Sequence, residues 1–117
     1  MSRYRRRTDK NQKVLVDILR EVGFTISLTH TLGRGFPDLV VGGMRRDIWE
    51  PIIVLVEVKS EDGTLTPEEE EFFSQWAGYP VYCIKTPGEL VVDAFGWEPG
   101  DGWSLDDAYN ARLNADL

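Results

Sequence analysis

Two short segments of this chain place charged residues among strong strand formers, and they constrain its fold more than any other part. Residues 35–42 read GFPDLVVG and residues 52–59 read IIVLVEVK. Runs of Val, Ile and Leu bounded by Gly, Pro and polar residues predict buried strands. A charge inside such a strand is costly unless a partner holds it. Asp38, Glu57 and Lys59 therefore need a physical reason to be there, and a divalent cation is the most economical one.

The spacing of the two segments predicts which charges meet. We expect strands over residues 38–42 and 52–59 to form an antiparallel hairpin around the polar loop 43–51. Residues equidistant from the centre of a hairpin face each other, so Asp38 lies opposite Glu57. Directly opposed side chains have Cβ atoms about 5 Å apart, which is close enough for two carboxylates to share one ion.

Strand alternation adds the cationic side chain of Lys59 to this face. Glu57 and Lys59 are two residues apart, so both side chains point to the face that carries Asp38, whereas Val58 points to the other face. A surface strand would alternate apolar with polar residues, but residues 52–58 are apolar on both faces apart from the glutamate. This pattern predicts a central, buried strand.

Paired carboxylates with a nearby lysine suit metal-assisted phosphate chemistry. Carboxylates are hard oxygen ligands for Mg²⁺ or Mn²⁺, which keep open positions for water and phosphate oxygens. A metal-bound water can attack phosphorus, and the ammonium group of Lys59 can orient that water or stabilise the developing charge. A surface salt bridge between Lys59 and either acid is the alternative, and the apolar flanks favour the metal.

The same residues resemble a known nuclease signature. Pro37-Asp38, followed nineteen residues after the aspartate by Glu57-Val58-Lys59, resembles the PD-(D/E)XK motif. The wider context is similar to the small stand-alone VRR-NUC proteins often seen in phages, and the similarity covers about residues 8 to 93. The segments that carry it are GRGFPDLVVG at 33–42, EVKS at 57–60, LTP at 65–67 and WAG at 76–78.

The resemblance implies a fold and an activity. The implied fold is an α/β PD-(D/E)XK restriction-endonuclease-like core, a mixed four-stranded sheet flanked by helices in the order αβββαβ. The implied activity is a Mg²⁺- or Mn²⁺-dependent DNA endonuclease related to Holliday-junction resolvases, often a homodimer. Asp38, Glu57 and the backbone carbonyl of Val58 would bind the metal, and Lys59 would assist the attacking water.

Two positions depart from the family pattern. Members of the superfamily often supply a third acid from the first helix, where this chain has Asn11-Gln12. The side-chain carbonyl of Gln12 can still hold a metal-bound water, so Gln12 is a further candidate catalytic residue, or Asp9 or another chain completes the site. In the helix after residues 65–67, Glu70 stands where a glutamine is expected. We expect the four consecutive glutamates 68–71 to form a solvated face that suits the start of a helix, and a position of Glu70 near Lys59 is the alternative.

The other elements follow from caps, turns and periodicity. Asp9 is a candidate cap for the first helix, Thr66-Pro67 starts another, and Ser104 with Asp107 suggests a third. The long connection after Lys59 predicts a right-handed crossover that makes the strands on either side of it parallel. We expect helices over about residues 10–22, 66–78, 86–92 and 104–113, and strands over 24–30 and 79–84 beside the hairpin.

Charge is divided unevenly along the chain. The whole chain carries a formal charge of −7, yet residues 1–60 hold eleven Lys and Arg against seven Asp and Glu, and residues 61–117 hold two against thirteen. The basic half therefore carries the motif and favours phosphate contacts there. A solvated terminus is the alternative for the basic arm, and solvated side chains for the hairpin tip. The candidate DNA-binding residues are Arg3, Arg5, Arg6, Arg7, Lys10, Lys13, Arg34, Arg45 and Arg46.

Length and composition favour one domain. We divide it into a basic arm (1–8), a core (9–93) and an acidic, aromatic C-terminal extension (94–117), which we expect to dock on its own core rather than on a second subunit. No segment resembles a membrane span or secretion signal, so we expect an intracellular protein of a bacterial or phage-infected cell. Cys83 is expected to be a buried strand residue, and His30 a structural or solvent-facing one.

Two classes of function remain open from the sequence. The first is a metal-dependent endonuclease, structure-specific on branched DNA such as Holliday junctions. The second is a catalytically weak or inactive nuclease-fold module that binds DNA or a protein partner. The intact Asp38, Glu57 and Lys59 favour the first class, whereas Gln12 and the acidic second half of the chain favour the second.

Overall fold

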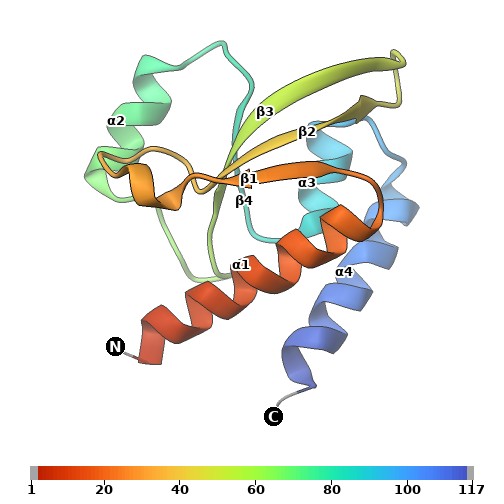
Figure 1. The fold of residues 1–117 in the computed structure, drawn as a ribbon, viewed down its shortest axis with the longest axis horizontal. Coiled ribbons are helices and arrows are strands. Elements are labelled where there is room, and N and C mark those ends of the chain that lie inside the picture. The colour runs from red at the N-terminus through yellow and green to blue at the C-terminus, as the bar shows by residue number, and fades with distance from the viewer. Residues whose placement is uncertain (1–2, 116–117) are drawn as a thin grey trace.

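The computed structural model describes residues 3–115, with the backbone alone for residues 3–9. Figure 1 shows the arrangement of its helices and strands. Along the chain these are α1 (Arg3–Glu21), β1 (Thr25–Leu28), a short 3-10 helix η1 (His30–Leu32), β2 (Leu39–Arg45), β3 (Glu50–Val58), α2 (Pro67–Gln75), β4 (Val81–Ile84), α3 (Pro87–Asp93) and α4 (Pro99–Asn114).

The four strands form one mixed sheet in the order β1-β2-β3-β4. The β1–β2 and β2–β3 pairs are antiparallel, and β3–β4 is parallel. The expected α/β architecture, with β3 in the interior of the sheet and a helical crossover to a parallel strand, is confirmed. In the hairpin between β2 and β3, Leu39 pairs with Val56. Continued by one residue, this register sets Asp38 opposite Glu57, as predicted from their equal distance to the centre of the hairpin.

The hairpin is longer than expected. The ladder continues to the pair Arg45 and Glu50, so residues 46–49 alone form the loop, and the predicted loop 43–51 is wrong at both ends. The chain reverses within four residues because Trp49 adopts a positive φ of 55°, which closes a turn tighter than a polar loop of nine residues requires.

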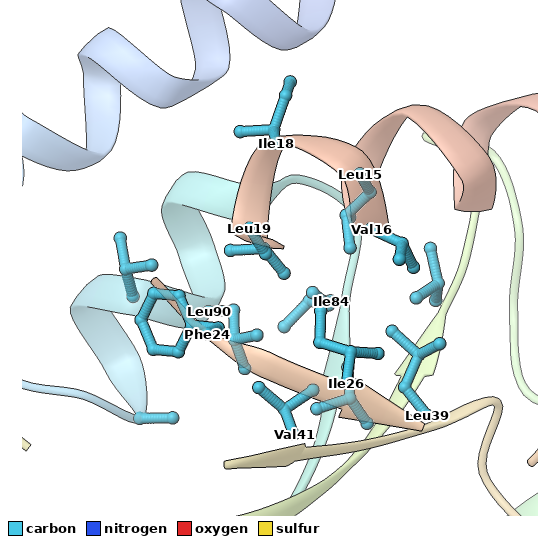
Figure 2. Close-up of a cluster of buried hydrophobic side chains, with 14 of the residues drawn as sticks. Leu15, Val16, Ile18, Leu19, Phe24, Ile26, Leu39, Val41, Ile84 and Leu90 are labelled. Carbon is cyan, nitrogen blue, oxygen red and sulfur yellow. The ribbon is translucent and has the colours of Figure 1, made fainter. Parts of the chain in front are cut away.

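Helices α1 and α3 cover one face of the sheet, and α4 packs on these two helices. Figure 2 shows side chains of α1 meeting those of the strands and of α3 in the cluster that forms the core. Alternate residues of β3, namely Val54, Val56 and Val58, point into this layer and are at most 3% exposed. The core is therefore a layer between the sheet and three helices, while α2 lies apart from them in Figure 1.

The opposite face of the sheet is buried only near the carboxyl end of β3. Ile53 is 67% exposed and Leu55 half-buried, whereas Glu57 is buried. The expectation that β3 is covered on both faces is therefore wrong for its first half. The prediction that Cys83 is buried is wrong as well, because its side chain lies on this open face of the edge strand β4, and the residue is exposed.

Helix α1 begins earlier than its expected cap. It covers Arg3–Glu21, so Asp9 lies inside the helix and is not its N-cap. Arginine, lysine and glutamine are good helix formers, and they allow the helix to extend through the basic arm. The strand expected up to His30 ends at Leu28 instead, and His30 lies exposed in η1.

The C-terminal extension docks on the core of its own chain, as expected. Helix α4 packs against α1 and α3, Tyr109 is 3% exposed, and Arg112 donates two hydrogen bonds to Glu21. The helix begins at Pro99, because proline at the first position suits a helix start. The predicted cap at Ser104 is wrong, since this residue lies within the helix.

The helices also bear on membrane association. Among residues 3–115, no helix is both long enough and apolar enough to cross a bilayer.

The contact between α3 and α4 requires a residue without a side chain. A Cβ atom at Gly88 would meet the carbonyl oxygen of Gly102 and the carboxylate of Asp106, whereas one at Gly100 would meet nothing within 4 Å. We expect Gly88→Ala to destabilise the fold by about 2 kcal/mol through overpacking, and Gly100→Ala to be neutral or slightly stabilising. Thermal unfolding of both variants measures the difference. Equal melting temperatures would contradict this packing.

Candidate metal and phosphate site

Asp38 is fixed by backbone groups just before β2. Its Oδ2 atom accepts a hydrogen bond from the backbone N–H of Val58 at 2.9 Å, across the hairpin. Its backbone carbonyl accepts another from the N–H of Thr29 at 2.7 Å, and the hydroxyl of Thr29 donates to the carbonyl of Pro37 at 2.8 Å. The register predicted from sequence is thus reinforced by contacts of the aspartate itself.

The loop that carries Asp38 is pressed against the start of α2. Gly35 has a φ of 75°, and a Cβ atom there would overlap the backbone of Glu68 and Glu69. Only glycine satisfies both the positive φ and this approach. The loop before Asp38 and the first turn of α2 are consequently held together, which brings a side chain of α2 to the site.

Glu57 is the buried group of the site. The residue is 3% exposed, and its Oε1 atom has no hydrogen-bond partner among the described residues. Its Oε2 atom lies 3.4 Å from the Nζ atom of Lys59. Burial, followed by the negative charge of Asp38 and contacts with Glu69, raises the pKa of Glu57 to about 9. The carboxyl group is therefore held where its charge is poorly compensated.

Lys59 is paired with a second acid, Glu69. Its Nζ atom donates to Glu69 Oε1 at 2.7 Å, and both side chains are mostly buried. Burial opposes the charge of Lys59, but the hydrogen bond to Glu69 and the charge of Glu57 raise its pKa overall. Burial likewise opposes the charge of Glu69, yet its bonds from Lys59 and from the Thr66 N–H lower its pKa.

The first turn of α2 explains why Glu69 reaches this position. Its Oε1 atom accepts from the backbone N–H of Thr66 at 2.8 Å, and the Thr66 hydroxyl accepts from the Glu69 N–H at 3.2 Å. This reciprocal pair is a capping box, which directs the Glu69 side chain back toward the start of the helix. The same oxygen thus serves both the helix cap and Lys59.

Sequence reasoning missed Glu69. Glu70 is exposed, as expected for a solvated glutamate, and the alternative that placed Glu70 near Lys59 is wrong because Glu69 makes that contact. The pattern Thr66-X-X-Glu69 is the signature of a capping box and would have pointed to the third residue after the cap.

Gln12 is not joined to the site by any contact that the structure describes. The residue lies partly exposed on α1, and its side chain makes no hydrogen bond to another described residue. Its neighbour Asn11 lines a separate cavity of about 550 Å³ on the helix-covered side of the sheet. The role expected for Gln12 as a holder of metal-bound water stays a prediction.

Several candidate DNA-binding residues are engaged within the chain. Arg45 donates two hydrogen bonds to Asp47, at 2.9 and 2.7 Å. Arg46 lies 3.5 Å from the centre of the Trp97 ring and 3.6 Å from Asp101. These contacts tie the hairpin tip to the C-terminal extension and leave both arginines partly exposed.

The other candidate DNA-binding residues lie on α1 and in the glycine-rich loop, and their surroundings differ. Lys13 pairs with Asp17 at 2.9 Å on an exposed surface, and Lys10 donates to the carbonyl of Leu113 at 3.0 Å. Arg34 is exposed beside a cavity of about 420 Å³ that is lined by acids of α2. The side chains of Arg3, Arg5, Arg6 and Arg7 lie outside the described residues, although their backbone belongs to α1.

Two carboxylates, those of Asp38 and Glu57, are the candidate ligands for a hard divalent cation. Among the described residues, no group of three or more His, Cys, Asp or Glu side chains is arranged to hold a metal. Asp38 and Glu57 nevertheless place two carboxylates at one strand end, and Glu57 Oε1 is buried without a partner. Mg²⁺ binds through one or two carboxylates and keeps its remaining positions for water and phosphate, so two are sufficient.

Comparison with known proteins finds no match to a protein family, to a curated protein or to a solved structure.

The raised pKa of Glu57 predicts a pH-dependent stability. Between about pH 4.5 and 9 the folded chain keeps a proton on Glu57 that the unfolded chain releases, so the free energy of unfolding falls as pH rises. One proton gives a slope of at most about 1.4 kcal/mol per pH unit. In EDTA, urea unfolding should show a flatter pH dependence for Glu57→Gln than for native protein. Glu50→Gln, at an exposed position of the same strand, should keep the native slope, and equal slopes in all three would refute the shift.

The double role of Glu69 can be separated by substitution. Glutamine also closes a capping box, so Glu69→Gln should keep most of the free energy of unfolding but lower the pKa of Lys59 by removing the charge beside it. Glu69→Ala should lower the pKa of Lys59 and also lower the free energy of unfolding, by about 1 kcal/mol. Urea unfolding and an NMR titration of the lysine side chain measure the two effects, with Glu70→Gln as the exposed control. A Lys59 pKa unchanged in Glu69→Gln would argue against the pairing.

Proposed function

We propose that this protein is a metal-dependent DNA endonuclease that hydrolyses phosphodiester bonds, with a PD-(D/E)XK-type site. The observation that carries the proposal is the buried Glu57 carboxyl beside Asp38, with one oxygen unpartnered and a lysine 3.4 Å from the other. Buried, poorly compensated carboxyl groups with raised pKa values are characteristic of functional sites. A purely structural ion pair would satisfy both oxygens.

The proposed reaction gives the acids and the lysine different roles. Asp38 and Glu57, with the backbone carbonyl of Val58, would hold Mg²⁺ or Mn²⁺. When bound, such an ion polarises phosphate oxygens and lowers the pKa of a coordinated water. Lys59 is held in one place by Glu69, so its ammonium group is positioned to orient the attacking water and to stabilise negative charge on the phosphate.

The substrate proposed is branched DNA such as a Holliday junction, cut by a homodimer. The concentration of positive charge in residues 1–60 supports a polyphosphate substrate. A symmetric dimer would place two such sites on two strands of a junction. Both the branch preference and the dimer rest on the resemblance to the VRR-NUC proteins, and sedimentation of the pure protein tests the dimer directly.

A catalytically weak module that binds DNA or a protein partner is the second candidate. Two observations favour it: Gln12 brings no charge to the site, and the Lys59 ammonium is already neutralised by Glu69 at 2.7 Å. The two candidates differ in whether bound DNA is cut.

Cleavage assays separate the candidates. Labelled four-way junctions, flaps and linear duplexes should be cut in Mn²⁺ by the native protein, most efficiently at branches. Asp38→Ala should reduce the cleavage rate by more than about 100-fold, because it removes a ligand that supplies several kcal/mol of transition-state stabilisation. Junction binding without cleavage of any substrate would support the binding module instead.

Metal binding has a readout that does not depend on activity. A ligand stabilises only the state that it binds, so Mn²⁺ should raise the melting temperature of the native protein and leave that of Asp38→Ala unchanged. An equal shift in both proteins would place the metal elsewhere.

A further inference from the structure

A cavity of about 550 Å³ lies on the helix-covered side of the sheet, beyond the carboxyl ends of the parallel strands β3 and β4. This volume is typical of small-molecule sites, and the carboxyl ends of parallel strands are where α/β sheets bind ligands. Its walls come from α1, α3, α4 and the loops that follow the two strands. The lining residues that bear on its chemistry are Asn11, Ser60, Lys85, Glu89, Tyr109 and Asn110.

Tyr109 shows that the cavity presents unused hydrogen-bonding capacity. The residue is 3% exposed, and no hydrogen bond joins its hydroxyl to another described residue. The hydroxyl is not itself a buried atom, because Glu57 Oε1 is the one buried polar side-chain atom without a partner in the described part of the chain, so it opens into the cavity. Burial raises its pKa to about 12, so the hydroxyl keeps its proton as a donor. A buried tyrosine normally finds a partner for this group. Here the group faces the cavity, where a ligand atom can serve as the partner.

The remaining polar groups suit the edge of a nucleobase. Asn11 and Asn110 carry amides that donate and accept, and the half-buried Glu89 carboxylate accepts. Lys85 is exposed, and its Nζ atom donates to the carbonyl of Glu61 at 2.7 Å, which leaves two of its three donors for a phosphate. Amide and carboxylate groups are the ones that read base edges in proteins.

The position of the cavity connects it to the site around Lys59. Ser60, in its wall, directly follows Lys59, and the Lys59 N–H donates to the carbonyl of Ile84 at 2.9 Å. This bond joins the ends of the two strands from which the cavity opens. A nucleotide adjoining a phosphate held near Lys59 therefore has a polar recess within reach of its base.

We propose that this cavity binds a single unpaired nucleotide, with the base inside, hydrogen-bonded to Tyr109, Asn11 and Glu89, and the phosphate toward Lys85. The inference rests on the proposed function, because it names the unpaired nucleotide as the part of the DNA substrate next to the cut. Glu89 can accept from an exocyclic amine, which adenine, guanine and cytosine carry and thymine lacks. Bases with an amine should therefore bind more tightly than thymine.

Nucleotide titrations followed by NMR test the proposal in EDTA, without metal chemistry. With dAMP, dGMP or dCMP at concentrations up to about 10 mM, amide signals of Asn11, Ser60 and Asn110 should shift, and dTMP should bind about fivefold more weakly, the effect of one hydrogen bond. Glu89→Gln should reduce the difference between bases. Tyr109→Phe, and Asn11→Ala at a half-buried position outside the core, should each weaken binding about fivefold, because each removes one of the proposed hydrogen bonds.

Two results would overturn the proposal: no shift at the cavity with any nucleotide, or the same shift with inorganic phosphate alone. The Asp38→Ala variant separates this inference from the proposed function, since it should bind nucleotides as tightly as the native protein. Nucleotide binding without DNA cleavage would refute the nuclease alone. Cleavage of DNA without nucleotide binding at the cavity would refute this inference alone.

Discussion

The burial of one carboxyl group, that of Glu57, is the constraint on which the arrangement of this protein depends. Val54, Val56 and Val58 must face the helices to form the core, so alternation forces Glu57 to the other face at the strand's covered end. There it meets Asp38 and a lysine. Lys59 compensates one of its oxygens, and the other has no hydrogen-bond partner in the part of the chain that the structure describes. Ionising this group costs stability, since its burial and the charge of Asp38 raise the pKa of Glu57 to about 9.

Local structure holds the neighbours of Glu57 more firmly than it holds Glu57. Asp38 is fixed by the backbone N–H of Val58, and Glu69 by a capping box with Thr66. Gly35 joins the two supports, because the loop before Asp38 packs directly on the first turn of α2. The site is thus built from a hairpin register and a helix start, and the Glu57 carboxyl is enclosed between them.

Much of this arrangement follows from the sequence because it depends on local rules. The register that sets Asp38 opposite Glu57 follows from hairpin symmetry, and the parallel β3–β4 pair from the length of the crossover. The start of α1 and the direction of the Glu69 side chain are also local, since helix propensity and the capping box encode them. The exposure of Cys83 and the contact of Glu69 with Lys59 do not follow from local rules. They depend on which sheet face the helices cover and where α2 packs, and these are tertiary choices that periodicity does not encode.

The end of β3 serves two different surfaces at once. Lys59 faces the carboxylates on the open side of the sheet, and Ser60, the next residue, lines the cavity on the helix-covered side. A ligand that touches both must pass over the edge formed by the carboxyl ends of β3 and β4, where the bond from Lys59 to Ile84 fixes the two strands together. Double-stranded DNA is too broad to enter such a recess, but an unpaired nucleotide is not. Under the proposed function, a nucleotide turned out of its stack has a recess for its base while its phosphate lies near Lys59.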